Sequence, residues 1–279
     1  MREALAFVSG TGQLADIDPD SRPLIPRKSN GKPKKLTKGS TDAKTIADLQ
    51  ERLWAESATG GRRSVLLVLQ GIDTAGKGGV TEHVVGACGP IGLEYTAFKK
   101  PTKAELRHDF LWRIRKRVPA PGVVAIFDRS HYEDVLAARV HNVVPEQIWS
   151  ARYDQINAFE QELVDNGTSV LKCFLHISYD TQRERLLRRL DLPRKHWKFN
   201  EADIDERALW DSYQAAFQTM LARCDTAAAP WYVIPSDSKK YRNWAVGELL
   251  RETLQSLDPH YPLGNLDVPA LHARLQPPN

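Results

Sequence analysis

A glycine-rich turn with a lysine follows a short apolar run in the first third of the chain. Val65 to Gln70 lead directly into G-I-D-T-A-G-K-G-G, residues 71–79. The spacing G-x-x-x-x-G-K is typical of a loop whose backbone N–H groups and one ammonium surround a phosphate at the start of a helix. We therefore expect phosphate to be bound by Gly71, Ala75, Gly76, Lys77, Gly78 and Gly79.

This loop differs from an ordinary phosphate-binding loop (P-loop) at two positions. Gly78 stands where Ser or Thr usually offers a hydroxyl to Mg²⁺, and Asp73 adds a carboxylate inside the loop. The loop has therefore lost one metal ligand and gained a candidate for another. A plain glycine turn with a chance lysine is the alternative, but the strand before it and the helical pattern after it disfavour that interpretation.

A second carboxylate follows another apolar run. Gly122 to Phe127 end in D-R-S-H-Y-E-D, residues 128–134. A carboxylate at the carboxyl end of a buried strand is the usual Mg²⁺ ligand of P-loop enzymes, so we expect Asp73 and Asp128 to hold Mg²⁺, with Mn²⁺ as the second candidate. The alternative for Asp128 is an N-cap of the helix expected after it.

Continuous apolar runs alternate with helical patterns along the chain, which has 42% hydrophobic residues. This alternation predicts an α/β protein with a parallel five-stranded sheet covered on both faces, in a three-layer fold like that of P-loop kinases, with a helical lid. The expected strands are Ser64 to Gln70, Glu94 to Phe98, Gly122 to Phe127, Val170 to Ile177 and Trp231 to Ile234.

Two regions depart from the alternation and define the expected organisation. Residues 1–40 are rich in Pro, Gly, Lys and Ser and predict a basic extended N-terminal arm, followed by one phosphotransferase domain over residues 41–279. Residues 181–223 give two helical patterns around a basic, aromatic loop and predict a lid that excludes water. Within it, Trp197 and Phe199 are candidates for closing the lid or for stacking on a base.

Several helix ends are marked in the sequence. Thr102-x-x-Glu105 is a capping box that predicts a helix over residues 103–117. Pro145 predicts the start of another helix, and Asn166-Gly167 its end. Apolar residues at helical spacing between Trp149 and Leu163 indicate a face that packs on the sheet.

The net charge is only +4, but the basic residues are clustered in residues 22–38, 99–117 and 183–198. Solvated helix faces would explain part of each cluster. Three cation clusters together with a phosphate loop favour a long polyanionic ligand. Beyond the loop, we expect phosphate contacts from Lys99, Lys100, Arg188, Lys195 and Lys198.

The remaining composition suggests a cytoplasmic protein that has no membrane partner. The apolar runs are of strand length, and the N-terminus does not have the pattern of a secretory signal. Cys88, Cys173 and Cys224 are odd in number and lack metal-binding spacing, as expected of reduced structural thiols.

Phosphoryl transfer requires positioning and charge neutralisation from these residues. Lys77 is expected on the transferring phosphate and Arg129 as a second cation, with Arg183 and Arg188 as candidates from the lid; a structural salt bridge is the alternative for each arginine. A nucleotide phosphate is already ionised, so no strong base is needed. The histidines are therefore expected to form hydrogen bonds or to pack: His83, His108 and His131.

Five segments in order resemble the polyphosphate kinase 2 family. They are G-I-D-T-A-G-K-G-G (71–79), K-K-P-T-K-A-E-L-R-H-D-F-L-W-R (99–113), F-D-R-S-H-Y-E-D-V (127–135), R-K-H-W-K-F (194–199) and I-P-S-D-S-K-K-Y (234–241). The resemblance implies reversible, Mg²⁺-dependent phosphate transfer from inorganic polyphosphate to AMP or ADP, giving ADP and ATP. It also implies a homodimer or homotetramer, and it leaves guanine nucleotides open as further substrates.

Glu133 bears on the choice of acceptor. Family members that resemble this chain in D-R-S-H-Y-E-D phosphorylate monophosphates as well as diphosphates, whereas members with Asn at this position mainly use diphosphates. We therefore expect Glu133 to act in catalysis and both AMP and ADP to be substrates. A plain helix-capping role is the alternative.

Two other functions share parts of this pattern. An ATP-dependent nucleoside monophosphate kinase would have the same loop, sheet and lid, but Gly78 speaks against it. A P-loop protein that binds nucleic acid would use the basic clusters, but no nucleic-acid motif supports it.

Overall fold

The computed structural model describes residues 1–25, 28, 43–264 and 266–276. Its centre is a parallel sheet with the strand order β2-β3-β1-β4-β5. The predicted α/β class with five parallel strands is confirmed, and each strand lies within two residues of its expected position. The strands are β1 (Ser64–Gln70), β2 (Leu93–Ala97), β3 (Val124–Asp128), β4 (Thr168–His176) and β5 (Trp231–Pro235).

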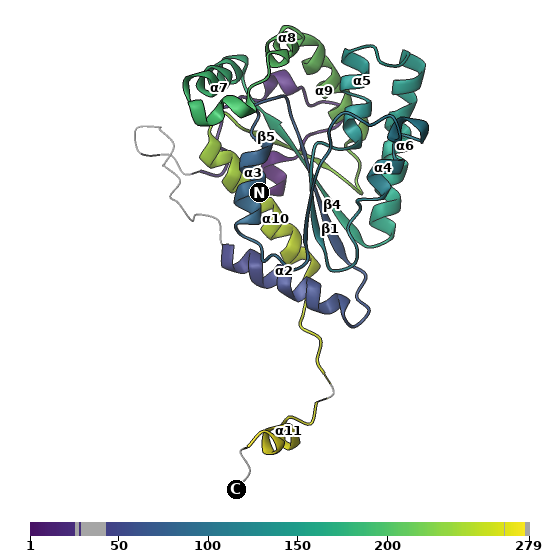
Figure 1. Ribbon diagram of the computed structural model, residues 1–279, viewed down its shortest axis with the longest axis vertical. Helices are drawn as coiled ribbons and strands as arrows, with labels where there is room; N and C mark the ends of the chain where they lie inside the picture. Colours follow the sequence, from purple (N-terminus) through teal and green to yellow (C-terminus); the bar gives the residue numbers. More distant parts are fainter. Residues whose placement is uncertain (26–27, 29–42, 265, 277–279) are drawn as a thin grey trace.

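Helices cover both faces of the sheet, which explains why its central strands are continuously apolar (Figure 1). Every residue of β1 is buried, as is every residue of β5. One face is covered by α2 (Ala43–Ser57), α3 (Lys77–Val85) and α10 (Lys239–Leu257). The other carries α4 (Trp112–Arg115), α5 (Ala137–Val140), α6 (Glu146–Asp165) and α9 (Trp210–Cys224).

The register of the strands brings the two expected carboxylate segments together. Leu69 of β1 is paired with Asp128 at the end of β3, and Ala97 of β2 is paired with Asp128 from the other side. Because parallel strands end at the same edge of the sheet, the loop after β1 and the turn after β3 are neighbours there.

The long helix α6 has the predicted limits and the predicted buried face. Pro145 precedes its first residue as N-cap, and Asn166 ends it before Gly167, whose φ of 92° is left-handed. Tyr153, Ile156, Phe159 and Leu163 are buried. This confirms that the stripe is core.

The prediction of a continuous helix over residues 103–117 was wrong, although its capping box forms. The Thr102 amide donates to Glu105 at 2.7 Å, and the Glu105 amide donates to the Thr102 hydroxyl at 3.3 Å. The helical turn then stops, because His108 is extended, and the Asp109 carboxylate accepts from the Leu111 amide to start a new turn. The result is a 3₁₀ turn, Glu105–Arg107, followed by α4.

The first 25 residues pack on the domain rather than forming an extended arm. Helix α1 (Arg2–Leu5) leads to Ala6, which forms an antiparallel bridge with Tyr232 on the outer edge of β5. Leu5, Phe7 and Leu14 are buried in the core. Burial of these three side chains offsets the conformational entropy lost when the segment is ordered. The polar composition of the segment as a whole gave no indication of this burial. The remainder of the predicted arm, residues 26–27 and 29–40, lies outside the described residues, as does most of the basic cluster 22–38.

Further elements complete the described chain. Above the carboxyl ends of the strands lie α7 (Tyr179–Asp191), a 3₁₀ turn (Pro193–Lys198) and α8 (Ala202–Ala208), and α11 (Val268–Arg274) stands away from the body (Figure 1). The three cysteines are free thiols, as expected. Within the described residues, no helix is both long and apolar enough to cross a membrane.

The packing of the N-terminal segment can be tested by changing Phe7 to Ala. The side chain is 5% exposed, so its loss should lower the free energy of unfolding by about 3 kcal/mol. Val8 is 60% exposed, and Val8→Ala is the matched control that should change it by less than about 0.5 kcal/mol. Urea unfolding measures both. Equal stabilities for the two variants would mean that the segment does not contribute to the core.

Candidate active site

The glycine-rich loop joins the end of β1 to the start of α3. Gly76, with a left-handed φ of 108°, is the N-cap, and Lys77 is the first residue of the helix. The Lys77 ammonium is buried and donates to the carbonyls of Gly71 at 2.8 Å and Ile72 at 3.4 Å. Burial and the nearby Arg129 lower the pKa of Lys77. The loop thus joins a buried strand to a helix N-terminus as the sequence predicted, and phosphate binding there stays a prediction.

An arginine from α10 explains two of the loop glycines. Arg242 is buried beneath the loop and donates to the Ala75 carbonyl at 3.1 Å. A Cβ at Gly76 would overlap its guanidinium, and one at Gly79 would lie 2.8 Å from Nη2. Burial and the neighbouring Arg185 lower the pKa of Arg242 to about 9. At Gly78, by contrast, a Cβ would meet nothing within 4 Å.

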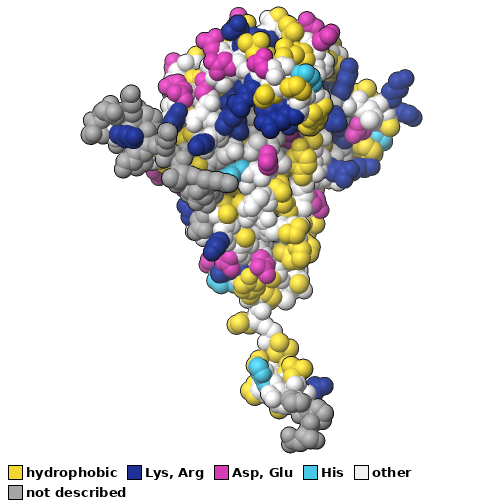
Figure 2. Space-filling view, turned by 60° about the vertical axis from the view of Figure 1, so that its left-hand side comes forward, with side chains coloured by type: hydrophobic (Ala, Val, Ile, Leu, Met, Phe, Trp, Pro, Cys, Tyr) yellow, Lys and Arg dark blue, Asp and Glu magenta, His cyan; other side chains and the backbone are white. Residues whose placement is uncertain are grey.

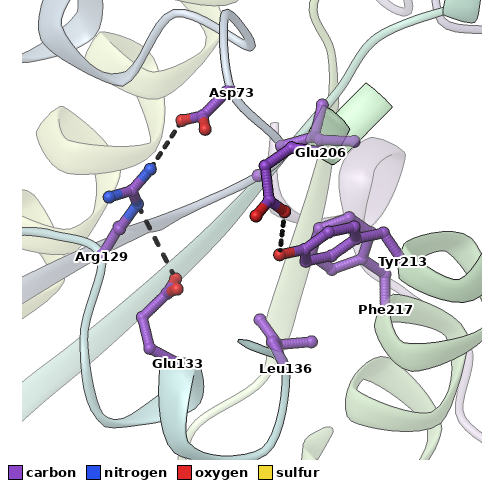
Figure 3. Close-up of a pocket in the computed structure, with 9 residues that line it drawn as sticks. Asp73, Arg129, Glu133, Leu136, Glu206, Tyr213 and Phe217 are labelled. Atoms are coloured by element: carbon purple, nitrogen blue, oxygen red, sulfur yellow. Dashed lines mark hydrogen bonds and ion pairs between the residues drawn. The ribbon is translucent and has the colours of Figure 1, made fainter. Parts of the chain in front are cut away.

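Arg129 joins the loop to the turn after β3 (Figure 3). Its Nη2 lies 2.6 Å from the Asp73 carboxylate, and its Nε lies 4.0 Å from that of Glu133. Burial alone would raise the pKa of Asp73, but Lys77 and Arg129 outweigh it and lower that pKa. Burial raises the pKa of Glu133, offset in part by Arg129 and Lys77. One cation therefore holds carboxylates from both segments.

The backbone is strained at both ends of this ion pair. Arg129 has a φ of 63°, and Thr74, which follows Asp73, has a φ of 69°. A left-handed conformation costs a residue with a Cβ about 1 kcal/mol or more, so the surrounding packing must hold both in place. Ser130, not Asp128, caps the turn that follows. The capping alternative for Asp128 is thus not observed, and Asp128 Oδ2 instead accepts from the Tyr95 hydroxyl at 3.3 Å.

The charges suit a small divalent cation. Asp73, Asp128 and Glu133 all act electrostatically on Lys77 and Arg129, and when all five are ionised one negative charge remains. Their oxygen ligands are those that Mg²⁺ prefers. Across the described part of the chain, no three His, Cys, Asp or Glu side chains already surround one metal position. Asp73 and Asp128 would therefore hold an ion together with water or phosphate oxygens.

The cavity at this cluster extends toward α8 and α9 (Figure 3). On that side Glu206 accepts from the Tyr213 hydroxyl at 2.7 Å, and His141 Nε2 lies 3.0 Å from the Glu206 carboxylate. This side of the cavity therefore carries polar side chains, Glu206 and Tyr213, together with the apolar Phe217. The lining residues are Gly71, Ile72, Asp73, Arg129, Glu133, Leu136, Glu206, Tyr213 and Phe217.

Cations from α7, from the 3₁₀ turn and from the start of α10 lie near one another on another side of the loop. Arg185 donates to the carbonyls of Thr74 at 2.9 Å and Ser236 at 2.6 Å, so it ties the loop to β5. Partial burial, together with Arg185, Arg188 and Lys195, lowers the pKa of Lys239, which shows that these cations are crowded. Figure 2 shows Lys and Arg side chains concentrated in the upper half of one face.

The structure brings together only some of the predicted site residues. Asp73, Lys77, Asp128, Arg129 and Glu133 form one cluster. Five of the other predicted cations are exposed: Lys99 and Lys100 after β2, Arg183 and Arg188 on α7, and Lys198 at the end of the 3₁₀ turn. Lys195, in the same 3₁₀ turn, is partly buried.

Sequence reasoning missed Arg185, Arg189 and Arg242. Arg189 lies near enough to Asp73 to lower its pKa, and it pairs with Asp203 at 2.8 Å. The four-residue spacing of Arg185 and Arg189 places them on one face of α7, which the sequence does contain as a signal. Arg242 offered no such signal, because its contact with the loop spans 167 residues.

Comparisons with known proteins agree with this geometry. The chain is 45% identical to an AMP/ADP-polyphosphate phosphotransferase of Meiothermus ruber over 91% of its length and 92% of the relative's. It is 41% identical to an ADP-polyphosphate phosphotransferase of Rhodopseudomonas palustris, covering 80% of each chain. The crystal structure of Polyphosphate Kinase 2 from Arthrobacter aurescens matches with a TM-score of 0.90 at 43% identity, over 98% of this chain and 95% of that one.

The sequence profile of the family described as Polyphosphate kinase 2 (PPK2) matches residues 35–261. This range contains the glycine-rich loop, the turn after β3 and all of α7 to α10. The chain therefore belongs to the polyphosphate kinase 2 family.

Proposed function

We propose that this protein transfers the terminal phosphate of inorganic polyphosphate to AMP and ADP, giving ADP and ATP, in a reversible reaction that needs Mg²⁺. The observation that carries this proposal is the cluster in which Arg129 holds Asp73 and Glu133 beside Lys77. The name of the 45% identical relative from Meiothermus ruber, which states both AMP and ADP, supports the choice of acceptors.

The state of Asp73 fits an acceptor that is already ionised. Its pKa is lowered and its carboxylate is paired with Arg129, so it is a poor general base near neutral pH. A hydroxyl acceptor would need such a base, whereas a nucleotide phosphate does not. Lys77 and Arg129 would neutralise the charge of the transferring group. A bound Mg²⁺, held by Asp73 and Asp128, would neutralise further charge and align donor with acceptor.

The donor chain would lie along the cations on one side of the loop. Arg188, Lys195 and Lys239 are close enough to affect one another electrostatically. Because these like charges repel one another, a linear polyanion would stabilise the arrangement. The acceptor would enter the cavity on the opposite side, between Arg129 and Tyr213.

The segment over residues 181–223 would act as a lid on this site. Arg185 of α7 contacts the loop, and Glu206 and Tyr213 of α8 and α9 line the cavity. Moving these helices would expose the cavity, and closing them would exclude water from the transferring phosphate. We further propose a cytoplasmic homodimer or homotetramer.

One assay separates this reaction from that of an ATP-dependent nucleoside monophosphate kinase. AMP or ADP is incubated with polyphosphate and Mg²⁺ in the absence of any nucleoside triphosphate, and the nucleotides are separated by chromatography. The proposed enzyme forms ADP and ATP. If phosphorylation of AMP required ATP and ignored polyphosphate, the kinase function would replace the one proposed.

Lys77→Ala and Asp128→Asn should each lower kcat at least about a hundredfold, because each removes a preorganised charge at the transferring group. Lys44→Ala and Asp165→Asn change exposed residues of the same types and serve as controls. Steady-state rates measure the effect, and circular dichroism confirms folding. A folded variant with normal turnover would contradict the assignment of the phosphate and metal sites.

Changing Glu133 to Asn should reduce kcat/KM for AMP about tenfold more than for ADP. The Glu133 carboxylate lies beside Arg129. It would repel the additional phosphate of a diphosphate acceptor, or it would hold a metal that lets the shorter monophosphate reach the same point. Glu133→Asp keeps the charge and is the matched control. An equal loss for both acceptors, or a wild-type enzyme inactive on AMP, would leave Glu133 without a role in acceptor choice.

The affinity for long polyphosphate should fall more steeply with salt than that for ADP. A long polyanion releases counterions at each Lys or Arg that it contacts. Each such contact steepens the slope of log K against log salt concentration by about 0.7. Lys195→Ala with Lys239→Ala should therefore lower the polyphosphate slope by about 1.4, whereas Lys116→Ala, directly after α4, should not. Equilibrium titrations at several salt concentrations measure the slopes. Identical slopes for both ligands would argue against a basic channel.

A further inference from the structure

Four polar side chains form a network in the core beneath the turn after β3. Lys172 of β4 donates to the Glu160 carboxylate of α6 at 2.6 Å, to the Tyr132 hydroxyl at 2.8 Å and to the Cys224 carbonyl at 2.6 Å. Glu160 also accepts from the Tyr132 hydroxyl at 2.8 Å and lies 3.1 Å from His131 Nε2. All four side chains are completely buried.

The two charges of the network are paired, and both are hydrogen-bonded to the Tyr132 hydroxyl. The three N–H groups of Lys172 each have an acceptor, and its charge is matched by Glu160. His131 joins the network through Nε2, whereas its Nδ1 has no hydrogen-bond partner among the described residues. A buried polar network whose ionised groups are paired in this way is rigid.

Stability alone does not account for this network. The free energy needed to remove two charges from water can exceed the gain from their attraction. Proteins with apolar side chains of similar volume at such positions are often equally stable. Lys172 lies in a strand whose neighbours are apolar, where a methionine could fill the same space. A buried charged pair at this position therefore calls for a role in fixing geometry.

The turn itself shows what is fixed. His131 and Tyr132 point into the core, whereas Arg129 and Glu133, on either side of them, line the catalytic cavity. Arg129 is also held in a left-handed backbone conformation, which its surroundings must enforce. His131 and Tyr132, which anchor the turn to the network, thus lie between the two residues that line the cavity. Glu133 follows Tyr132 directly, and only Ser130 separates His131 from Arg129.

We infer that Lys172, Glu160, Tyr132 and His131 form a positioning unit that holds Arg129 and Glu133 in place for phosphoryl transfer. The inference rests on the proposed function for its kinetic consequence. None of the four is itself a lining residue of the cavity, so they act through the turn and not on the substrate.

The first test is Tyr132→Phe, which removes the hydroxyl shared by Lys172 and Glu160 and little else. We expect kcat to fall about tenfold with KM changed less than twofold, since the reacting groups are misplaced while the binding cations remain. In a background that carries both Arg129→Ala and Glu133→Gln, the same change should alter kcat less than twofold, because both groups that it positions are gone. Reductions that multiply in the triple variant would overturn the inference.

The second test separates positioning from stability. The paired variant Glu160→Gln with Lys172→Met removes both charges and keeps their volumes, so Tm should stay the same or rise. Its kcat should still fall about tenfold. Glu162→Gln, on the same helix but in an exposed pair with Arg115, is the control and should keep normal turnover. A stable paired variant with normal kcat would refute a positioning role.

A third measurement does not depend on catalysis. Amide hydrogen exchange of residues 129–134 should be about tenfold faster in the paired variant, whereas β1 and β4 keep their protection. Unchanged exchange in the turn would overturn the inference even if the wild-type enzyme proved inactive with polyphosphate. An inactive wild type with faster exchange would instead refute the proposed function and leave the positioning unit standing.

Discussion

The contact of Arg129 with Asp73 is the interaction on which the site depends. It closes the loop after β1 onto the turn after β3, two segments more than fifty residues apart in the chain. The parallel register makes this possible, since Leu69 and Asp128 are direct neighbours. Glu133 lies on the other side of the same guanidinium. Without Arg129, three carboxylates would lie close together with Lys77 as their nearest cation.

The phosphate loop and the turn after β3, which both contain a residue with a left-handed backbone, are held by buried or partly buried polar groups that do not line the cavity. Arg242 and Arg185 donate to carbonyls of the phosphate loop and fix its path. On the other side, Lys172 and Glu160 support the turn that carries Arg129. These contacts hold the charged groups at the cavity in position before any ligand binds, as the proposed electrostatic catalysis would require.

Local patterns in the sequence were sufficient to predict the sheet and the phosphate loop. Continuous apolar runs located all five strands, because a parallel strand that is buried on both faces is composed mainly of apolar residues. The prediction of one helix over residues 103–117 was wrong, because the Asp109 side chain accepts from the Leu111 amide and starts a new turn there. Arg242 and Lys172 could not be foreseen, because each works through contacts with residues distant in sequence, and a lone basic residue carries no sign of its partner.

Gly78 connects the geometry of the loop with the kind of donor proposed. An ordinary P-loop places a hydroxyl there to hold the metal against a nucleoside triphosphate. Here that position is open, and the carboxylates available for a metal stand at the other end of the loop, at Asp73 and across the sheet at Asp128. In the proposed arrangement Asp73 and Asp128 would hold the metal. The donor would then be bound by backbone N–H groups and side-chain cations, which would bind phosphate units alike and would need no base or sugar to recognise. A repeating polyphosphate satisfies that requirement at every position along its chain.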